Sequence, residues 1–316
     1  MNEFDLIKKY FNFTSTHALL GVGDDAALIP LNKNEFMAIS MDTLNMGHHF
    51  TEDSDPYYLG WKSLAVNVSD IVSMGGQPRY ALLSISLKSL DVNWIGKFTK
   101  GIKACAKKYN IEIIGGDTNK GSTSISIAIM GNVSSNNVLK RSGAIPEDEI
   151  WVTNEVGYAA LHFNQHSLLP KYKKSISNCL KKRSQEEFLK PQPPLEFILE
   201  TKSMINSAID LSDGLVGDLK HILNSSSVGA KIEIDNIPMH KWFKENNQYE
   251  LAMCGGEDYQ ILMTASHKHH NKIQNLLKKY SLKGAMIGKI TKDKKIEYSL
   301  HGKKIKLSKE GFTHFG

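Results

Sequence analysis

Acidic residues recur in this 316-residue sequence where a strand or helix gives way to a loop, and several of them follow glycines. A Gly-Val-Gly segment precedes one aspartate pair, and Gly-Gly pairs precede Asp117 and Glu257. Carboxylate oxygens are ligands that Mg²⁺ takes from proteins, with waters and substrate phosphates completing its shell. The pattern therefore favours a site for Mg²⁺ and a phosphate compound. The acidic residues concerned are Asp24, Asp25, Asp42, Asp70, Asp117, Asp210, Asp213, Glu257 and Asp258.

The segment GGDTNKGST, residues 115–123, is similar to a phosphate-binding loop but does not match one. The loop G-x-x-x-x-G-K-[ST] needs a lysine after its second glycine, and Ser122 stands there, after Gly116 and Gly121. Asp117 would repel a phosphate unless a cation lay between them, and Mg²⁺ held by Asp117 would supply that charge. The glycines predict that Asp117 lies on a tight loop that a ligand approaches closely.

Each acidic residue also has a purely structural interpretation. Aspartate is common in turns and at helix N-caps, so Asp213 could simply cap the helix that follows it. Asp70 is harder to explain in this way. It shares a face with Asn67 in a helix whose other residues there, such as Val68 and Ile71, are apolar. Burying an unpaired charge is costly, so we expect Asp70 to have a partner.

The spacing of apolar residues predicts a chain of mixed strands and helices. We expect the class to be α+β, with a boundary near residues 139–146 that separates domains at 1–139 and 140–316. The expected strands are residues 35–43, 80–87, 124–133, 149–153, 231–234 and 259–264, with short strands within 286–307. The expected helices are an amphipathic one at residues 1–11, then 56–74, 92–109, a helical region at 158–189, and one after residue 213.

Composition excludes several classes of protein. The three cysteines lie far apart with no Cys-x-x-Cys or Cys/His spacing, which argues against a disulfide framework or a zinc site. No stretch reaches the ~18 apolar residues that a membrane span needs, and the first residues lack the apolar run of a signal peptide. We therefore expect a cytoplasmic protein. The net charge of +6 and the lysines of residues 171–182 leave a basic nucleic-acid-binding protein as an alternative, although no known binding module is present.

Seven segments together are specific. They are GVGDDAALI, MDTLNMGHHF, LAVNVSDIVSMGGQP, IIGGDTNKG, RSGAIPEDEIWVT, IDLSDGLVGDL and GGEDYQILMT, in this order. With these segments the whole chain resembles the thiamine-monophosphate kinases. The resemblance implies a two-domain fold like that of aminoimidazole ribonucleotide synthetase. It implies an N-terminal α/β domain that forms a barrel with its copy in a homodimer, followed by a C-terminal α+β domain.

The resemblance also implies roles for individual residues. ATP contacts would be Gly116, Asp117, Arg141 and Ser212. The acceptor, thiamine monophosphate, would contact His49, Glu257 and Phe312. Several Mg²⁺ ions would be held by Asp25, Ser40, Met41, Asp42, Asp70, Asp117, Asp210 and Asp213.

Four of these assignments keep alternatives open. Met41 departs from the hydroxyl residue often found at its position, which is harmless only if that position binds metal through its backbone carbonyl. His49 could belong to a surface loop, Arg141 to a salt bridge, and Phe312 to simple docking of the tail.

The implied reaction moves the γ-phosphoryl group of ATP onto a phosphate that is already anionic near neutral pH, because its second pKa is about 6. We therefore expect no general base, and expect catalysis by positioning and by positive charge from Mg²⁺ and Arg141. Enzymes of the same fold remain alternatives: aminoimidazole ribonucleotide synthetase, a hydrogenase-maturation dehydratase and selenophosphate synthetase. The last would need a reactive cysteine or selenocysteine near the N-terminus, and no cysteine precedes Gly21.

Overall fold

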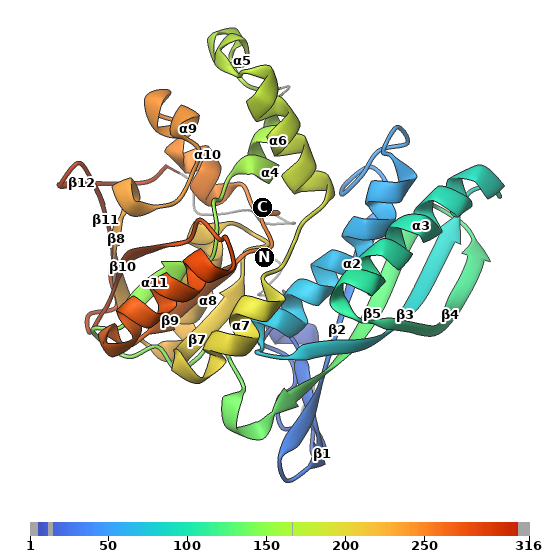
Figure 1. Cartoon of the computed structure of the whole chain (residues 1–316), viewed down its shortest axis with the longest axis horizontal. Coiled ribbons are helices and arrows are strands. Elements are labelled where there is room, and N and C mark those ends of the chain that lie inside the picture. The colour runs from blue at the N-terminus through green and yellow to red at the C-terminus, as the bar shows by residue number, and fades with distance from the viewer. Residues whose placement is uncertain (1–5, 12–14, 166, 309–316) are drawn as a thin grey trace. The chain divides into compact units, whose positions relative to one another are not determined.

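The computed structural model describes residues 6–11, 15–165 and 167–308, which form two compact units. The N-terminal unit consists of residues 15–138 and 189–195, and the C-terminal unit of residues 6–11, 139–188 and 196–308. Both units combine a sheet with helices (Figure 1), so the predicted α+β class is confirmed. Among the described residues, no helix is long and apolar enough to span a membrane.

The N-terminal unit is built on a five-stranded sheet with the order β1-β2-β5-β3-β4. All neighbours pair antiparallel except β3 and β4, which are parallel and are joined through a helix. Its strands are β1 (Ala27–Asn32), β2 (Glu35–Asn45), β3 (Gln77–Leu87), β4 (Glu112–Lys120) and β5 (Ser124–Ser134).

Two 18-residue helices, α2 (Pro56–Ser73) and α3 (Val92–Tyr109), pack against each other, and α2 covers one face of this sheet (Figure 1). Asp55 and Asp91 cap them by accepting hydrogen bonds from backbone N–H groups of the first turn. Almost every residue of α2 is buried. A helix that is apolar on nearly all sides belongs in a protein core, which explains why this segment has so weak an amphipathic pattern.

The proline-rich segment of residues 189–195 packs on these helices. Its backbone carbonyls accept hydrogen bonds from the Trp61 indole N–H, at 2.9 Å from Pro191, and from the Tyr109 hydroxyl, at 3.2 Å from Pro193. The ammonium group of Lys190 lies 4.4 Å from the centre of the Trp61 ring. These contacts explain why seven residues far along the chain belong to the N-terminal unit.

The C-terminal unit contains a seven-stranded sheet with the order β12-β11-β8-β10-β6-β9-β7, in which only β8 and β11 pair in parallel. Its strands are β6 (Glu149–Val152), β7 (Ile205–Asp210), β8 (Gly229–Glu233), β9 (Ile261–Ala265), β10 (Ala285–Thr291), β11 (Ile296–Leu300) and β12 (Lys303–Ile305). Its α-helices are α4 (Tyr158–Asn164), α5 (Pro170–Ser175), α6 (Asn178–Leu189), α7 (Leu195–Thr201), α8 (Leu215–Ser226), α9 (Lys241–Glu245), α10 (Tyr249–Cys254) and α11 (His270–Lys279).

Short helical turns of both units complete the elements: a π-helical turn η1 (Ile7–Phe11) and the 3₁₀ turns η2 (Ser135–Asn137), η3 (Lys202–Met204), η4 (Ile234–Asn236) and η5 (His267–His269).

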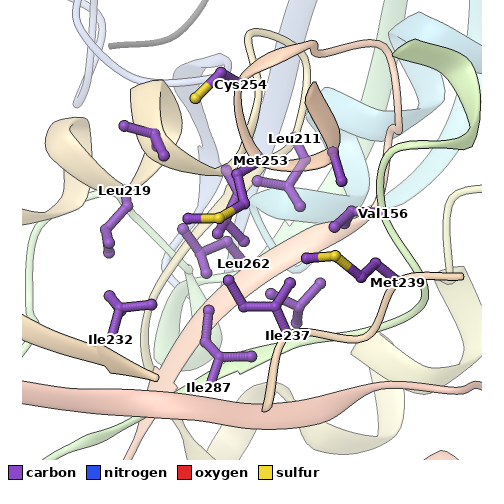
Figure 2. Packing of buried hydrophobic residues seen from close by; sticks show 14 of the residues in the cluster. Val156, Leu211, Leu219, Ile232, Ile237, Met239, Met253, Cys254, Leu262 and Ile287 are labelled. Atoms are coloured by element: carbon purple, nitrogen blue, oxygen red, sulfur yellow. The ribbon is translucent and has the colours of Figure 1, made fainter. Parts of the chain in front are cut away.

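The main core of the C-terminal unit lies on one face of its sheet, where Ile232, Leu262 and Ile287 meet Leu219 of α8 and Met253 of α10 (Figure 2). Helices α7 and α11 meet where the ring of Phe197 contacts that of Tyr280, the residue that follows α11.

Several expected elements differ from those observed. Strand β2 runs to Asn45, so Asp42 lies inside a strand and does not end it. Asp117 lies within β4 rather than on a tight loop. The helical region at 158–189 is three separate helices, because Pro170 begins a new one and a bend separates the last two.

Candidate active site

In the N-terminal unit, a polar group links strand β2 to helix α2. The Ser40 hydroxyl donates a hydrogen bond of 2.5 Å to Oδ2 of Asp70, and the Asp42 backbone N–H donates one of 2.9 Å to Oδ1 of Asn67. Asn67 in turn donates to the Ser63 carbonyl oxygen one turn earlier in the helix. Asp70 therefore has the partner that its apolar surroundings require, and the strand holds its carboxylate in one position.

Asp25 comes to the same edge of the sheet. It precedes β1 by two residues, and the first residue of β1, Ala27, pairs with Ile39 of β2. The chain therefore enters β1 beside the stretch that contains Ser40 and Asp42. The Asp25 residue is only 7% exposed. Carboxylates and a hydroxyl on neighbouring segments form a set of hard oxygen donors, the chemistry that suits Mg²⁺.

Met41 lies between Ser40 and Asp42 but points to the opposite face of the sheet, and it is 66% exposed. Side chains alternate between the two faces along a strand. A site that includes the side chains of Ser40 and Asp42 can therefore include Met41 only through its backbone. At this position the loss of a hydroxyl side chain does not remove a ligand from that face.

Asp117 does not join this group within one chain. It pairs with Ser84 of β3, which pairs with Ser126 of β5, which pairs with Thr43 of β2. Paired residues share a face of the sheet, and Thr43 lies on the opposite face from Ser40 and Asp42. We call the face that carries this row, and that is turned away from α2, the outer face. The Asp117 carboxylate accepts a hydrogen bond of 3.0 Å from the side-chain amide of Asn119.

Gly116 is explained by the packing of the strands. Its φ angle is +152°, and a Cβ atom there would lie 1.7 Å from the Leu83 carbonyl oxygen of β3. Only glycine fits so close to the neighbouring backbone. The residue therefore has a structural role whether or not its N–H contacts a phosphate.

In the C-terminal unit, two loops carry the other predicted residues side by side. Strand β7 ends at Asp210, and the loop after it contains Ser212 and Asp213. The Glu257 N–H donates a hydrogen bond of 2.8 Å to the Ser212 carbonyl oxygen. A Cβ atom on Gly256, whose φ angle is +71°, would lie 2.4 Å from the same oxygen. The glycine thus permits the contact between the loops, which places the backbones of Ser212 and Glu257 together.

Both loops are anchored in the hydrophobic core. Leu211 from the first loop and Cys254, just before the second, lie among the buried side chains in Figure 2. The Leu211 N–H also donates to the Gln260 carbonyl oxygen at 2.8 Å, and the Tyr259 N–H to the Leu211 carbonyl oxygen at 2.8 Å. Glu257 and Tyr259 have positive φ angles of 65° and 47°, which cost energy for residues with a side chain. The core contacts and loop pairing hold this strained backbone.

Two further carboxylates support these loops: Asp258, which the sequence placed only in the general acidic pattern, and Asp218, which the sequence did not single out. Oδ1 of Asp258 accepts a hydrogen bond of 2.9 Å from the Gly157 N–H at the start of α4, and burial raises the pKa of this carboxyl well above its ordinary value. Oδ2 of Asp218, in the first turn of α8, accepts one of 3.2 Å from the Asp213 N–H. Asp218 follows Asp213 by five positions, a spacing that fits a carboxylate reaching back from the first turn of a helix.

The remaining predicted residues are more dispersed. Nδ1 of His49 accepts a hydrogen bond of 3.1 Å from the Asn45 N–H, which leaves Nε2 as the nitrogen that carries the proton in the neutral ring. Arg141 follows Lys140, whose carbonyl oxygen accepts a hydrogen bond from Ala208 of β7, so Arg141 runs beside the strand that ends at Asp210. Phe312 lies outside the described residues.

The chain matches two family models: "AIR synthase related protein, N-terminal domain" over residues 23–133, and "AIR synthase related protein, C-terminal domain" over residues 146–301. It is 38% identical to the thiamine-monophosphate kinase of Buchnera aphidicola subsp. Schizaphis graminum, covering 99% of both chains. The chain belongs to the thiamine-monophosphate kinase family. It is also 34% identical to the Escherichia coli K12 member, covering 99% of this chain and 98% of that one.

A solved structure of this family has the same fold. It is described as "AaThiL complexed with AMPPCP and TMP", is 28% identical in sequence, and superposes with a TM-score of 0.83 over 99% of this chain and 97% of that chain. The two-domain architecture predicted from the sequence is thereby confirmed.

Proposed function

We propose that this chain phosphorylates thiamine monophosphate with ATP and releases thiamine diphosphate and ADP. Its relation to thiamine-monophosphate kinases over 99% of its length carries the proposal. The oxygen donors around Asp70 and the paired loops that contain Asp213 and Glu257 support it. A kinase for two polyanionic reactants needs positive charge held in place, and oxygen donors of this kind can hold Mg²⁺.

The reaction is a transfer from one phosphate to another. An anionic oxygen of the acceptor phosphate attacks the γ-phosphorus of ATP, and the bond from that phosphorus to the bridging oxygen of ADP breaks. No proton has to be removed from the attacking oxygen near neutral pH. The protein therefore needs to bind, orient and neutralise the reactants, and we assign no residue as a general base.

Magnesium fits the donors that the two units offer. In the N-terminal unit the ligands would be Asp25, Ser40, Asp42, Asp70 and the backbone carbonyl of Met41. In the C-terminal unit they would be Asp210, at the end of β7, and Asp213 in the loop that follows. Bound Mg²⁺ would neutralise phosphate charge and help to align the reactants.

We assign the remaining contacts as the sequence predicts them. Gly116, Asp117, Arg141 and Ser212 serve ATP, and Arg141 contributes a guanidinium fork that matches phosphate oxygens. His49, Glu257 and Phe312 serve thiamine monophosphate. His49 accepts a hydrogen bond at Nδ1, so in the neutral ring Nε2 carries the proton that would be donated to a phosphate oxygen.

We further propose that a second copy of the chain covers the outer face. On this face, Met41 and Leu82 both pair with Ala128 of β5 and so form one cross-strand row. Tyr80 lies two residues before Leu82 on β3, on the same face. All three are exposed in one chain, and a contiguous apolar sheet face of this kind marks an interface. The polar row with Asp117 borders these residues. Because Asp117 faces away from Asp70 in its own chain, it would serve the site of the partner copy.

The test is ADP release from ATP and Mg²⁺, with thiamine monophosphate, free thiamine or no acceptor. The proposal predicts ADP only with the monophosphate, together with thiamine diphosphate as product. ADP release in the absence of any acceptor would contradict the proposal. So would ADP release that occurs only with an amide substrate of a related enzyme. Binding of ATP without turnover would move the chemistry to another enzyme of this fold and would withdraw His49, Glu257 and Phe312.

A further inference from the structure

A further group of side chains of metal-ligating types lies in the C-terminal unit, on other strands and helices than the proposed kinase residues there. Nδ1 of His267 lies 2.7 Å from Oε1 of Glu149, and Nδ1 of His270 lies 3.0 Å from Oε1 and from Oε2 of the same carboxylate. One ligand atom from each of these three residues lies within 4.8 Å of the others. We call Glu149, His267 and His270 the His-Glu-His cluster.

Regular structure brings the cluster together. Glu149 begins β6 and pairs with Ala265, the last residue of β9. The chain then passes through η5, which contains His267, and enters α11 at His270. The buried residues Ile273, Leu276 and Leu277 hold this helix to the protein, so its first turn faces the start of β6.

The carboxylate is buried while one of the histidines is open to solvent. The side chain of Glu149 is 2% exposed, those of His270 and His267 29% and 77%. A buried carboxylate requires hydrogen bonds or a positive charge nearby. Two imidazole nitrogens provide hydrogen bonds in the absence of metal. The exposure of His267 gives an ion from solution a path to the carboxylate.

We propose that the His-Glu-His cluster binds a divalent transition-metal ion of the zinc type. Two imidazoles and one carboxylate form a ligand set found in zinc sites that keep a position open for water. Imidazole ligands suit zinc, copper, nickel and iron, whereas Mg²⁺ prefers oxygen. The cluster therefore takes a different class of ion from the carboxylate sets assigned to Mg²⁺.

The geometry requires only a small change on binding. Zinc bonds to nitrogen and oxygen at about 2.0–2.2 Å, so neighbouring ligand atoms of a tetrahedral site lie about 3.3 Å apart. The present separations of 2.7 and 3.0 Å are those of hydrogen bonds. Each ring would bind the ion through Nδ1 as the neutral tautomer that carries its proton on Nε2, so Nδ1 gives up its proton, and a small side-chain rotation opens the space. Metal binding would thus replace the hydrogen bonds between the two imidazoles and the carboxylate with three coordination bonds, one from each residue.

Neighbouring charges reduce the expected affinity without removing the site. Burial, and to a smaller extent the charges of Lys268 and Lys272, lower the pKa of His269, which lies between the two histidines in sequence. Lys289 of β10 pairs with Glu149 of β6, and the two side chains share a face of the sheet, but Lys289 is exposed. Its ammonium group can extend into water, so the carboxylate remains the buried charge of the cluster.

A bound ion would fasten α11 to β6 and so stabilise the C-terminal unit. Because a ligand that binds only the folded state raises its stability, the effect appears as a higher melting temperature. The sequence gives no direct sign of such a site. Its carboxylate precedes the histidines by more than 100 positions, and no cysteine takes part.

The test uses full-length, tag-free protein that has been treated with a chelator and then kept in excess Mg²⁺, so that hard-oxygen sites are filled. Zn²⁺ is added for thermal unfolding and isothermal titration, and Co²⁺ for the visible absorption of a tetrahedral site. The variants are His270→Gln and His267→Gln. His269→Gln is the matched control, because it lies between the two ligands in sequence but outside the cluster.

The proposal predicts about one Zn²⁺ per chain, a higher melting temperature and a visible Co²⁺ band for the wild type and for His269→Gln. His270→Gln and His267→Gln should lose the band and the shift. A purely hydrogen-bonded cluster gives a different result: the two variants lower the melting temperature of the metal-free protein, and Zn²⁺ changes none of the proteins. That result, or an equal Zn²⁺ effect on all four proteins, would overturn the proposal.

Discussion

The hydroxyl group of Ser40 and the carboxylate of Asp70 are 2.5 Å apart, and this contact joins strand β2 to helix α2. It fixes the orientation of the Asp70 carboxylate against β2. A carboxylate held in this way is suited to bind a cation without reorganising. The contact therefore sets the geometry of the acidic set in the N-terminal unit.

We predict that Asp70→Asn and Ser40→Ala reduce turnover to different extents. Asp70→Asn removes a metal ligand's charge with little change in volume and should lower kcat by at least about 100-fold. Ser40→Ala removes a ligand or a contact that positions one. It should lower kcat by about 10–100-fold and raise the Mg²⁺ concentration needed for half-maximal activity. Kinetics at several Mg²⁺ concentrations measure both effects. Ser63→Ala, which removes another hydroxyl bonded within α2, is the control and should keep its Mg²⁺ dependence.

The orientation of Asp117 predicts that two inactive variants restore activity when mixed. Asp117→Asn and Asp70→Asn should each be folded and inactive. If Asp117 serves the partner copy, a heterodimer of the two variants contains one intact site, and random exchange should recover about a quarter of wild-type activity. Co-expression with two different tags isolates the heterodimer for assay. An inactive heterodimer would show that Asp117 acts elsewhere, and a fully active Asp117→Asn variant would remove it from the site.

The close contact between β4 and β3 predicts that Gly116→Ala is destabilising. The new Cβ would meet the Leu83 carbonyl oxygen, and the strained backbone alone costs about 1–3 kcal/mol. Gly115→Ala is the matched control, because a Cβ there meets only the flexible end of the Leu82 side chain, at 3.4 Å. Chemical denaturation measures the free energy of unfolding of each. Equal stability of the two variants would mean that the strands are not so closely paired.

The buried carboxyl of Asp258 predicts a dependence of stability on pH. Its folded-state pKa is raised, so its contribution is fully favourable at low pH and is lost as the pH rises from the ordinary value through the folded value. Asp258→Asn keeps an acceptor for the Gly157 N–H and removes the charge. It should therefore be more stable than the wild type at about pH 8, with the difference vanishing near about pH 4.

Thermal unfolding across this pH range measures the effect. Asp55→Asn is the control, since Asp55 is an exposed helix cap that asparagine replaces well. If Asp258→Asn were the less stable protein at the higher pH, the carboxylate would be stabilised by contacts stronger than its desolvation.

The sequence predicted the strands and helices that carry apolar patterns, such as β5, where buried and half-buried residues alternate without interruption. It failed for β4, because every residue of that strand is exposed and most of the polar ones follow one another. A strand without an alternating pattern is read as a loop, and its glycines strengthened that interpretation. The position of Asp117 on the outer face could be learned only from its pairing with Ser84.

For the site, the residue types and their order indicated the metal chemistry, since carboxylates near glycines were visible in the sequence. Their supporting contacts were not. The helical spacing places Asn67 on the same face as Asp70, but the bond that Asn67 accepts from the Asp42 N–H depends on how β2 lies against α2. The cluster of Glu149 with two histidines depends in the same way on a strand meeting a helix from a distant part of the chain.

The most direct test of the central claim follows the transferred group itself. Protein, Mg²⁺, thiamine monophosphate and ATP labelled in its γ-phosphoryl group are incubated together, and the labelled products are separated. Direct transfer predicts that the label enters the terminal phosphate of thiamine diphosphate in a one-to-one ratio with the ADP formed. Label found in inorganic phosphate, with thiamine monophosphate unchanged, would contradict the account.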